Sequence, residues 1–237
     1  MIRILYLYHD LMTLYGDNGN IRVLEKYLRD QGEEVIVDRK TVGYTLDLAD
    51  YDFIYCGCGM ERSRNAALKH LINYKQDMKK AFEEGKVILF TGNSWQMLGK
   101  GIQTADGEKL EGLGLFEFDV TEQSEKRYVG DVLGHARGFE ETFVGFINRC
   151  STVNNLDDPF MTIDKVIGNI PDKTDGIHRN NLFGVSLNGP LLVKNPHFAR
   201  KIVSLLVKDY KPIDYENERR GYETTISELS SDMEKHV

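Results

Sequence analysis

The first 115 residues alternate between apolar runs rich in β-forming residues and stretches whose apolar residues recur at helical spacing. Four runs are predicted strands: 2–8, 33–41, 51–59 and 86–90. Two stretches are predicted helices: one from Asn20, as its N-cap, to Gly32, and a long amphipathic one over 66–84. Strands that alternate with helices pair in parallel and are covered on both faces. The alternation therefore predicts an α/β fold, a three-layer α/β/α sandwich with a mostly parallel sheet.

The pattern changes after residue 115. Shorter strands joined by polar turns are predicted over 116–122, 127–134 and 142–149, then a strand over 182–189 and a helix over 196–209. From Lys211 the chain is strongly charged and poor in core residues, which predicts a peripheral helix or partial disorder. The expected organisation is one domain over residues 1–210 followed by a charged C-terminal tail over 211–237.

Composition excludes several classes of protein. The net charge of -7 gives no basic surface for nucleic acid or for an anionic membrane. The N-terminal apolar run is too short for a signal peptide, and no stretch approaches the ~20 apolar residues of a membrane span. Three cysteines without a leader fit a reducing compartment. We therefore expect a cytoplasmic protein that binds neither nucleic acid nor membrane.

The segment Thr91–Gly99, which follows the strand over 86–90, is the most informative for chemistry. A strand, a sharp turn and a helix form the nucleophile elbow of many α/β enzymes. The apex side chain of such an elbow faces a cleft above the sheet, where nearby N–H groups can hold an oxyanion.

This segment resembles the elbow of class I glutamine amidotransferases, and more narrowly that of the cobyric acid synthase-like branch. That branch includes the glutaminase subunits of lipid II isoglutaminyl synthases. Its motif is a cysteine, two small residues, an aromatic residue, a glutamine, and then leucine and glycine. Trp95, Gln96, Leu98 and Gly99 match this motif, which places the nucleophile position at Gly92. Gln96 and Asn93 then belong to the expected substrate pocket.

Other stretches carry the same resemblance, which spans residues 3–207. The loop 10–20, with Asp17, is similar to the loop after the first strand of the isoglutaminyl synthase subunits. The run 54–59 resembles the family's oxyanion loop, so Gly57 and Gly59 are expected at the substrate. The run 186–196 resembles the histidine segment, with Asn188 in place of the histidine. Arg127 falls where the family has an arginine that can hold the glutamine carboxylate.

The two replaced positions determine the expected activity. Gly92 offers no nucleophile, and Asn188 cannot accept a proton near neutral pH. Loss of the nucleophile alone costs a comparable enzyme on the order of 10⁶ in kcat. Glycine tolerates positive φ, so the elbow shape can persist without the chemistry. If only the reacting groups were lost, the oxyanion N–H groups and Arg127 should remain in place.

The resemblance implies partners as well. It implies a Mur-ligase-like subunit, or another amidating synthetase, that receives ammonia, and glutamine or a related small molecule in the cleft. It does not decide between cell-wall and cobalamin chemistry. No cofactor and no metal are expected.

An alternative from another class is an active hydrolase or amidotransferase with relocated chemistry. Ser94, two residues past the apex, or His9, beside the 10–20 loop, would then act. The simpler interpretation, which we favour, is that Ser94 is a helix-start residue packed where the family has glycine. Asp17 and Asn18 either bind a ligand or shape a turn through their own backbone.

The remaining reactive residues have simpler interpretations. Cys56 and Cys58 are expected as strand-end residues, because a lone C-x-C is weak as a metal pair. Cys150 could replace the missing thiol from another strand. His135 and His178 are expected in surface turns.

Overall fold

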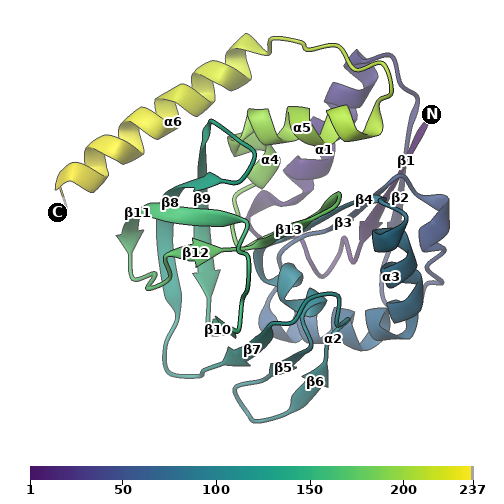
Figure 1. Cartoon of the computed structure of the whole chain (residues 1–237), viewed down its shortest axis with the longest axis vertical. Helices are drawn as coiled ribbons and strands as arrows, with labels where there is room; N and C mark the ends of the chain where they lie inside the picture. Colours follow the sequence, from purple (N-terminus) through teal and green to yellow (C-terminus); the bar gives the residue numbers. More distant parts are fainter. Residues whose placement is uncertain (236–237) are drawn as a thin grey trace.

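The computed structural model describes residues 1–235. Its centre is a six-stranded sheet in the order β13-β14-β4-β3-β1-β2, parallel except for the edge strand β13 (Figure 1). The strands are β1 (Ile2–Leu7), β2 (Val35–Lys40), β3 (Phe53–Cys56), β4 (Val87–Thr91), β13 (Ile177–Arg179) and β14 (Leu182–Val185). The central strands β3, β4 and β14 are buried along their whole length. The mostly parallel sheet predicted from the apolar runs is therefore confirmed.

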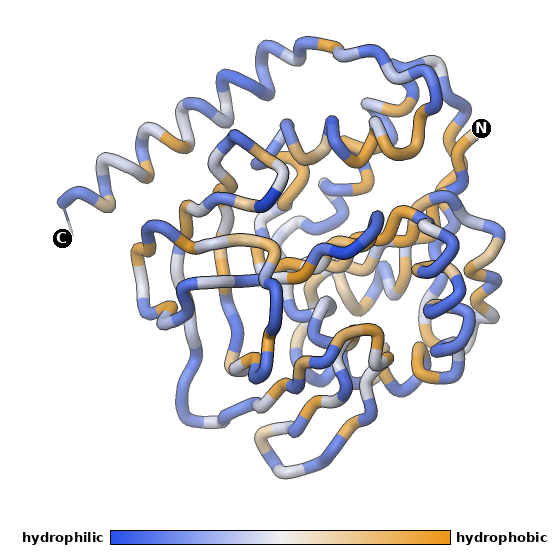
Figure 2. Tube along the Cα trace, viewed as in Figure 1, coloured by the Kyte–Doolittle hydropathy of each residue, from blue (hydrophilic) through white to orange (hydrophobic). Residues whose placement is uncertain are grey.

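Helices cover both faces of this sheet. On one face lie α1 (Asn18–Asp30), α4 (Leu191–Lys194) and α5 (Pro196–Leu206), and on the other lie α2 (Glu61–Leu71) and α3 (Lys75–Glu83). Successive strand side chains point to opposite faces, so Tyr55 enters the first core and Ile54 the second. Apolar segments gather along the central strands in Figure 2. These two cores make the molecule the predicted three-layer α/β/α sandwich.

Two four-stranded sheets extend the sandwich. One, ordered β10-β7-β5-β6, contains β5 (Gly101–Gln103), β6 (Lys109–Glu111), β7 (Asp119–Glu122) and β10 (Ser151–Asn154). The other, ordered β12-β11-β8-β9, contains β8 (Tyr128–Ala136), β9 (Thr142–Arg149), β11 (Met161–Gly168) and β12 (Thr174–Asp175). The extension thus begins at β5, earlier than residue 115, because short strands with little apolar alternation leave only a faint periodic signal.

The C-terminal segment forms one long helix, α6 (Glu216–Lys235), that lies across the outer sheet (Figure 1). Met233 is buried with Leu133 and Val144, and Tyr222 donates a hydrogen bond to the Thr142 carbonyl oxygen at 2.8 Å. Tyr215, just before the helix, stacks on Tyr27 with ring centroids 3.9 Å apart. The predicted charged tail is therefore a packed peripheral helix over residues 216–235, and its last two residues, 236 and 237, lie outside the described part.

Two predictions about helices are wrong. The helix predicted over 66–84 is two helices, α2 and α3, joined by the 3₁₀ turn η3 (Ile72–Tyr74). This turn redirects the chain so that Met78 and Ala81 stay buried. Asn20 does not cap α1, which begins two residues earlier; its side chain instead donates to the Tyr55 hydroxyl and accepts from the Leu192 N–H, each at 2.7 Å. Tertiary contacts therefore outweighed the local capping preference.

The remaining helical turns are η1 (Leu14–Gly16), η2 (Leu48–Asp50) and η4 (Gly92–Leu98). Across residues 1–235, no helix combines the length and the apolar character that crossing a membrane requires.

Candidate functional site

The elbow after β4 is present. Gly92 follows Thr91 with φ +61, a left-handed conformation that side chains rarely adopt. The chain then continues as the 3₁₀ segment η4, rather than as the predicted α-helix, and all seven of its residues are buried. Glycine at the apex therefore allows the turn without steric strain.

The structure brings Gly92 and Asn188 together. Asn188 lies just after β14, where its backbone pairs with Phe146 and its Nδ2 donates to the Ser186 carbonyl oxygen at 3.1 Å. Its Oδ1 points at Gly92, so closely that a Cβ on Gly92 would collide with it. Asn188 is 1% exposed, and this Oδ1 has no hydrogen-bond partner within the described residues. The two positions that the resemblance assigned to the reacting pair thus face each other.

Cys58 fills the space between them. A Cβ on Gly92 would lie 2.5 Å from Cys58 Sγ and closer still to Cys58 Cβ. Cys58 is 2% exposed, and burial raises the pKa of its thiol to about 12. β3 ends at Cys56, so the interpretation of Cys58 as a strand-end residue is wrong. The sequence feature that could have placed Cys58 at the site was its position within the predicted oxyanion loop.

The N–H groups of that loop already have acceptors. The Cys58 N–H donates to the Asp17 carboxylate, and the Gly59 N–H donates to Asn93 Oδ1 at 3.1 Å. Asn93 Nδ2 returns a hydrogen bond to the Gly59 carbonyl oxygen at 2.7 Å. Cβ atoms on Gly57 or Gly59 would collide with the preceding loop. Both N–H groups are therefore paired inside the protein, the second of them by Asn93, which stands where the family motif has a small residue.

Asp17 joins the first loop to the centre of the sheet. Its carboxylate also accepts hydrogen bonds from Thr91 Oγ1 at 3.2 Å and from Asn20 Nδ2 at 3.3 Å. Burial raises its pKa to about 7, and its hydrogen bonds moderate that rise. The neighbouring Asn18 is exposed as the first residue of α1. Asp17 is thus a fully enclosed carboxyl group rather than one that faces open solvent.

Ser94 and Gln96 point into the protein. The Ser94 hydroxyl is 0% exposed and lies 2.7 Å from the Thr91 carbonyl oxygen and 2.9 Å from that of Cys56. Gln96 Oε1 accepts from Arg64 at 2.7 Å, and its Nε2 donates to Ser151 Oγ at 2.7 Å. Both side chains are therefore engaged in structural hydrogen bonds.

Arg64 was not anticipated from the sequence. Its guanidinium is 0% exposed and binds Glu122 as well as Gln96, so an ion pair lies beneath the elbow. A buried charge needs such a partner. No local pattern marks Arg64, because its i+3 and i+4 neighbours on α2 are ordinary core residues.

Arg127 lies at the mouth of the site, half exposed. It donates to Glu61 Oε1 at 2.6 Å and to Asn148 Oδ1 at 2.8 Å. Burial lowers the pKa of its guanidinium, but the Glu61 hydrogen bond outweighs this, and the pKa is raised. Cys150 Sγ lies 3.4 Å from the same Glu61 oxygen, and burial raises the pKa of this thiol to about 11. These residues border an open cavity of about 300 Å³.

The histidines of the sequence analysis have other partners. His9 packs edge-on against the Tyr6 ring, His135 pairs with Asp164, and His178 stacks on Phe183. Within residues 1–235, no hydrogen bond joins any of these three rings to the elbow. Over the same range, no cluster of three or more His, Cys, Asp or Glu residues is arranged to hold a metal ion.

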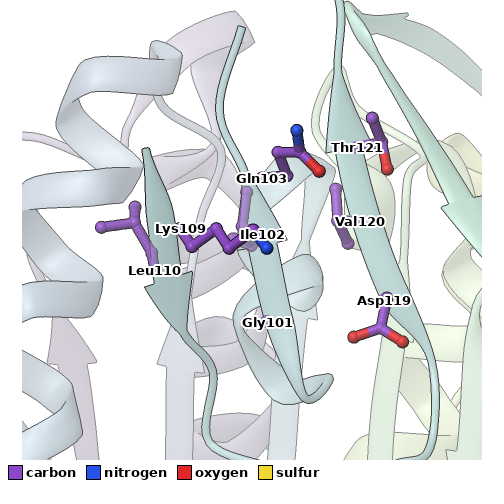
Figure 3. Close-up of a pocket in the computed structure, with 8 residues that line it drawn as sticks. All are labelled: Gly101, Ile102, Gln103, Lys109, Leu110, Asp119, Val120 and Thr121. Atoms are coloured by element: carbon purple, nitrogen blue, oxygen red, sulfur yellow. The ribbon is translucent and has the colours of Figure 1, made fainter. Parts of the chain in front are cut away.

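A second hollow, of about 260 Å³, lies on the small sheet formed by β5, β6 and β7 (Figure 3). Lys109, Gln103 and Thr121 are among the side chains that border it. None of the site residues predicted from the sequence lines this hollow, so the elbow remains the candidate site.

Comparisons with known proteins agree on one family. Residues 3–196 match the CobB/CobQ-like glutamine amidotransferase domain. The lipid II isoglutaminyl synthase (glutamine-hydrolyzing) subunit GatD of Streptococcus pneumoniae is 30% identical over 230 residues, which cover 96% of this chain and 88% of that protein. The corresponding subunit of Staphylococcus aureus is 37% identical over 200 residues, covering 81% of this chain and 79% of that protein.

A solved structure shares the fold at low identity. The structure of PurLQS from Thermotoga maritima matches with a TM-score of 0.56 at 16% identity, and covers 95% of this chain and 100% of the matched chain. At this identity the match shows a shared fold and nothing more.

Proposed function

The chain belongs to the CobB/CobQ-like glutamine amidotransferase family, and from that premise we propose that it is a non-hydrolysing subunit of an amidating synthetase. The proposed partner is a Mur-ligase-like subunit. The two relatives named above are subunits of lipid II isoglutaminyl synthase, which favours cell-wall chemistry over the cobalamin pathway. We place this complex in the cytoplasm, as the cysteine usage suggests.

One observation carries the proposal: Gly92 and Asn188 face each other where a thiolate and an imidazole would have to stand. Amide hydrolysis by this route needs a nucleophile and a base that shuttles its proton. A backbone CH₂ and a carboxamide provide neither. The nearest thiol, Cys58, is buried with a pKa near 12, so almost none of it is thiolate at neutral pH.

The competing idea of relocated chemistry has little support in the geometry. Ser94 is fully buried and its hydroxyl is directed at main-chain carbonyl groups, so it is neither accessible nor paired with a base. His9 contacts the Tyr6 ring, and the Ser94 hydroxyl is bonded to main-chain carbonyl oxygens rather than to His9. A serine without an adjacent base is a weak nucleophile.

The surface beyond the carboxyl ends of the parallel strands suits a protein partner. Tyr15, Met60 and Val193 are large apolar residues that are 39%, 44% and 44% exposed. They follow β1, β3 and β14, so all three lie beyond the carboxyl ends of parallel strands, where α/β proteins gather ligands and partners. We infer that the synthetase subunit covers the surface formed by Tyr15, Met60 and Val193.

Two measurements test the proposal. The purified chain should release no ammonia from glutamine above the uncatalysed background, with the Staphylococcus aureus subunit as the active comparison. Release that a Ser94→Ala variant abolishes would establish the relocated chemistry instead.

The second measurement concerns the partner. The chain should co-purify from its native cells with a Mur-ligase-like protein, and Met60→Asp should weaken that association. Ile36→Asp is the matched control, because Ile36 is similarly exposed, at 37%, but lies on the edge strand β2. Isolation of the chain alone, as a monomer, would contradict the partner assignment.

A further inference from the structure

We propose that this chain occupies its own glutamine site: internal side chains take up each interaction that a bound glutamine would otherwise make. The inference rests on the proposed function and extends it. A subunit that has merely lost its reacting groups would still bind glutamine. A subunit whose site is filled from within would not bind it at all.

The first internal group is the Cys58 side chain. It stands where the side chain of the apex residue would begin, in contact distance of the point that a Cβ on Gly92 would occupy. With Cys58 2% exposed, that volume is closed to solvent. A ligand carbonyl carbon would need the same volume in order to approach the apex. Cys58 and a substrate amide therefore exclude each other.

The second group comprises the acceptors on the oxyanion loop. The Cys58 N–H is held by the Asp17 carboxylate and the Gly59 N–H by Asn93 Oδ1, so both donors are satisfied inside the protein. Asn93 stands where the family motif has a small residue, and its two hydrogen bonds to Gly59 close the loop on the elbow. A ligand oxygen would have to break these bonds without a compensating gain.

The third internal group is the Glu61 carboxylate, which pairs with the Arg127 guanidinium. The Glu61 carboxylate accepts from the guanidinium at 2.6 Å, as the carboxylate of an amino acid would. Glu61 is the first residue of α2, directly after the oxyanion loop, so one short segment supplies both Cys58 and Glu61. The two loop N–H groups and the Arg127 nitrogen that faces Glu61 are thus all engaged by groups of this chain.

The unpartnered Oδ1 of Asn188 fits this interpretation. It is buried and aimed at Gly92, yet no donor of the described residues reaches it. Cys58 crowds the same point and keeps a ligand N–H from it. An acceptor left unsatisfied in this way destabilises the folded chain. Removal of the cysteine side chain should therefore open a small polar space rather than an inert void.

The test compares variants that carry Gly92→Cys and Asn188→His. In this double variant the introduced thiol collides with Cys58 and should be alkylated slowly by iodoacetamide, as mapped by mass spectrometry. Adding Cys58→Gly should relieve the collision and let the new thiol reach the imidazole. One unit of pKa lowering gives tenfold more thiolate, so alkylation at position 92 should accelerate by about tenfold or more. Adding Cys56→Ala, which removes a buried thiol outside the contacted space, should change nothing. Equal rates with and without Cys58→Gly would overturn the inference.

A binding experiment covers the case in which these variants do not fold. The unmodified chain should show no heat of binding with L-glutamine by titration calorimetry, whereas Cys58→Gly combined with Asn93→Gly and Glu61→Gln should bind it. Binding by the unmodified chain without ammonia release would overturn the self-occupied site and leave the proposed function intact. Ammonia release by the unmodified chain would overturn the proposed function.

Discussion

Asp17 accepts a hydrogen bond from the backbone N–H of Cys58, 41 residues away in the sequence, and is itself 0% exposed. The same carboxylate oxygen accepts from Thr91 Oγ1 at the end of β4. One enclosed carboxyl group thus ties the first loop, the oxyanion loop and the elbow together. Its protonation state should therefore affect the stability of the whole site.

The contribution of Asp17 to stability should fall as pH rises from about 4 to about 7, because burial raises the pKa of this carboxyl group to about 7 in the folded chain. Its unfolded value is near 3.9, so the folded state binds this proton more tightly. The contribution is complete below about pH 4 and is lost as pH rises through the folded pKa. Asp17→Asn should remove that dependence, as measured by urea denaturation at several pH values.

The difference between the two pH profiles isolates Asp17. Burial lowers the pKa of His197 to about 4, which removes stability as pH falls below about 6.5 and so acts in the opposite direction. His197 is present in both proteins, and its effect cancels in the difference. Parallel profiles for the two proteins would show that Asp17 does not titrate with a raised pKa.

Gly92→Ala should destabilise the fold by about 2–5 kcal/mol. Left-handed backbone costs a non-glycine residue roughly 1–2 kcal/mol, and overpacking adds typically 1–3 kcal/mol. Gly114→Ala is a matched control, with φ +64 but only ordinary contacts to the flexible Lys75 side chain. Thermal or chemical denaturation of both variants separates the strain, which they share, from the collision with Cys58. Equal losses would mean that the site has room at position 92.

Arg64→Ala should cost about 3–5 kcal/mol, because it leaves the Glu122 carboxylate buried without its partner and breaks the Gln96 hydrogen bond. Arg62→Ala, two residues earlier on the exposed side of α2, should stay within about 0.5 kcal/mol. Chemical denaturation measures both. A small effect at Arg64 would indicate that Glu122 is protonated or that water reaches it.

Much of the fold could be read from local patterns. The strands β1, β3 and β4 are nearly continuous apolar runs, and burial on both faces leaves that signature whatever the neighbours are. The short strands β5 and β6 escaped notice, since three residues give too little periodicity to recognise. The break between α2 and α3 also escaped, because both halves carry apolar residues at helical spacing.

The sequence by itself determined the sandwich, the elbow at Gly92 and the pairing of positions 92 and 188. The sandwich and the elbow depend on apolar periodicity and on the freedom of glycine at positive φ, whereas the pairing of positions 92 and 188 follows from the resemblance of two distant segments to the family's motifs. Only the tertiary structure decided what fills the site. Cys58 meets Asp17 and Asn93 across separate loops, 41 and 35 residues away in the sequence. Such contacts are set by how the strand ends converge above the sheet, which no local pattern encodes.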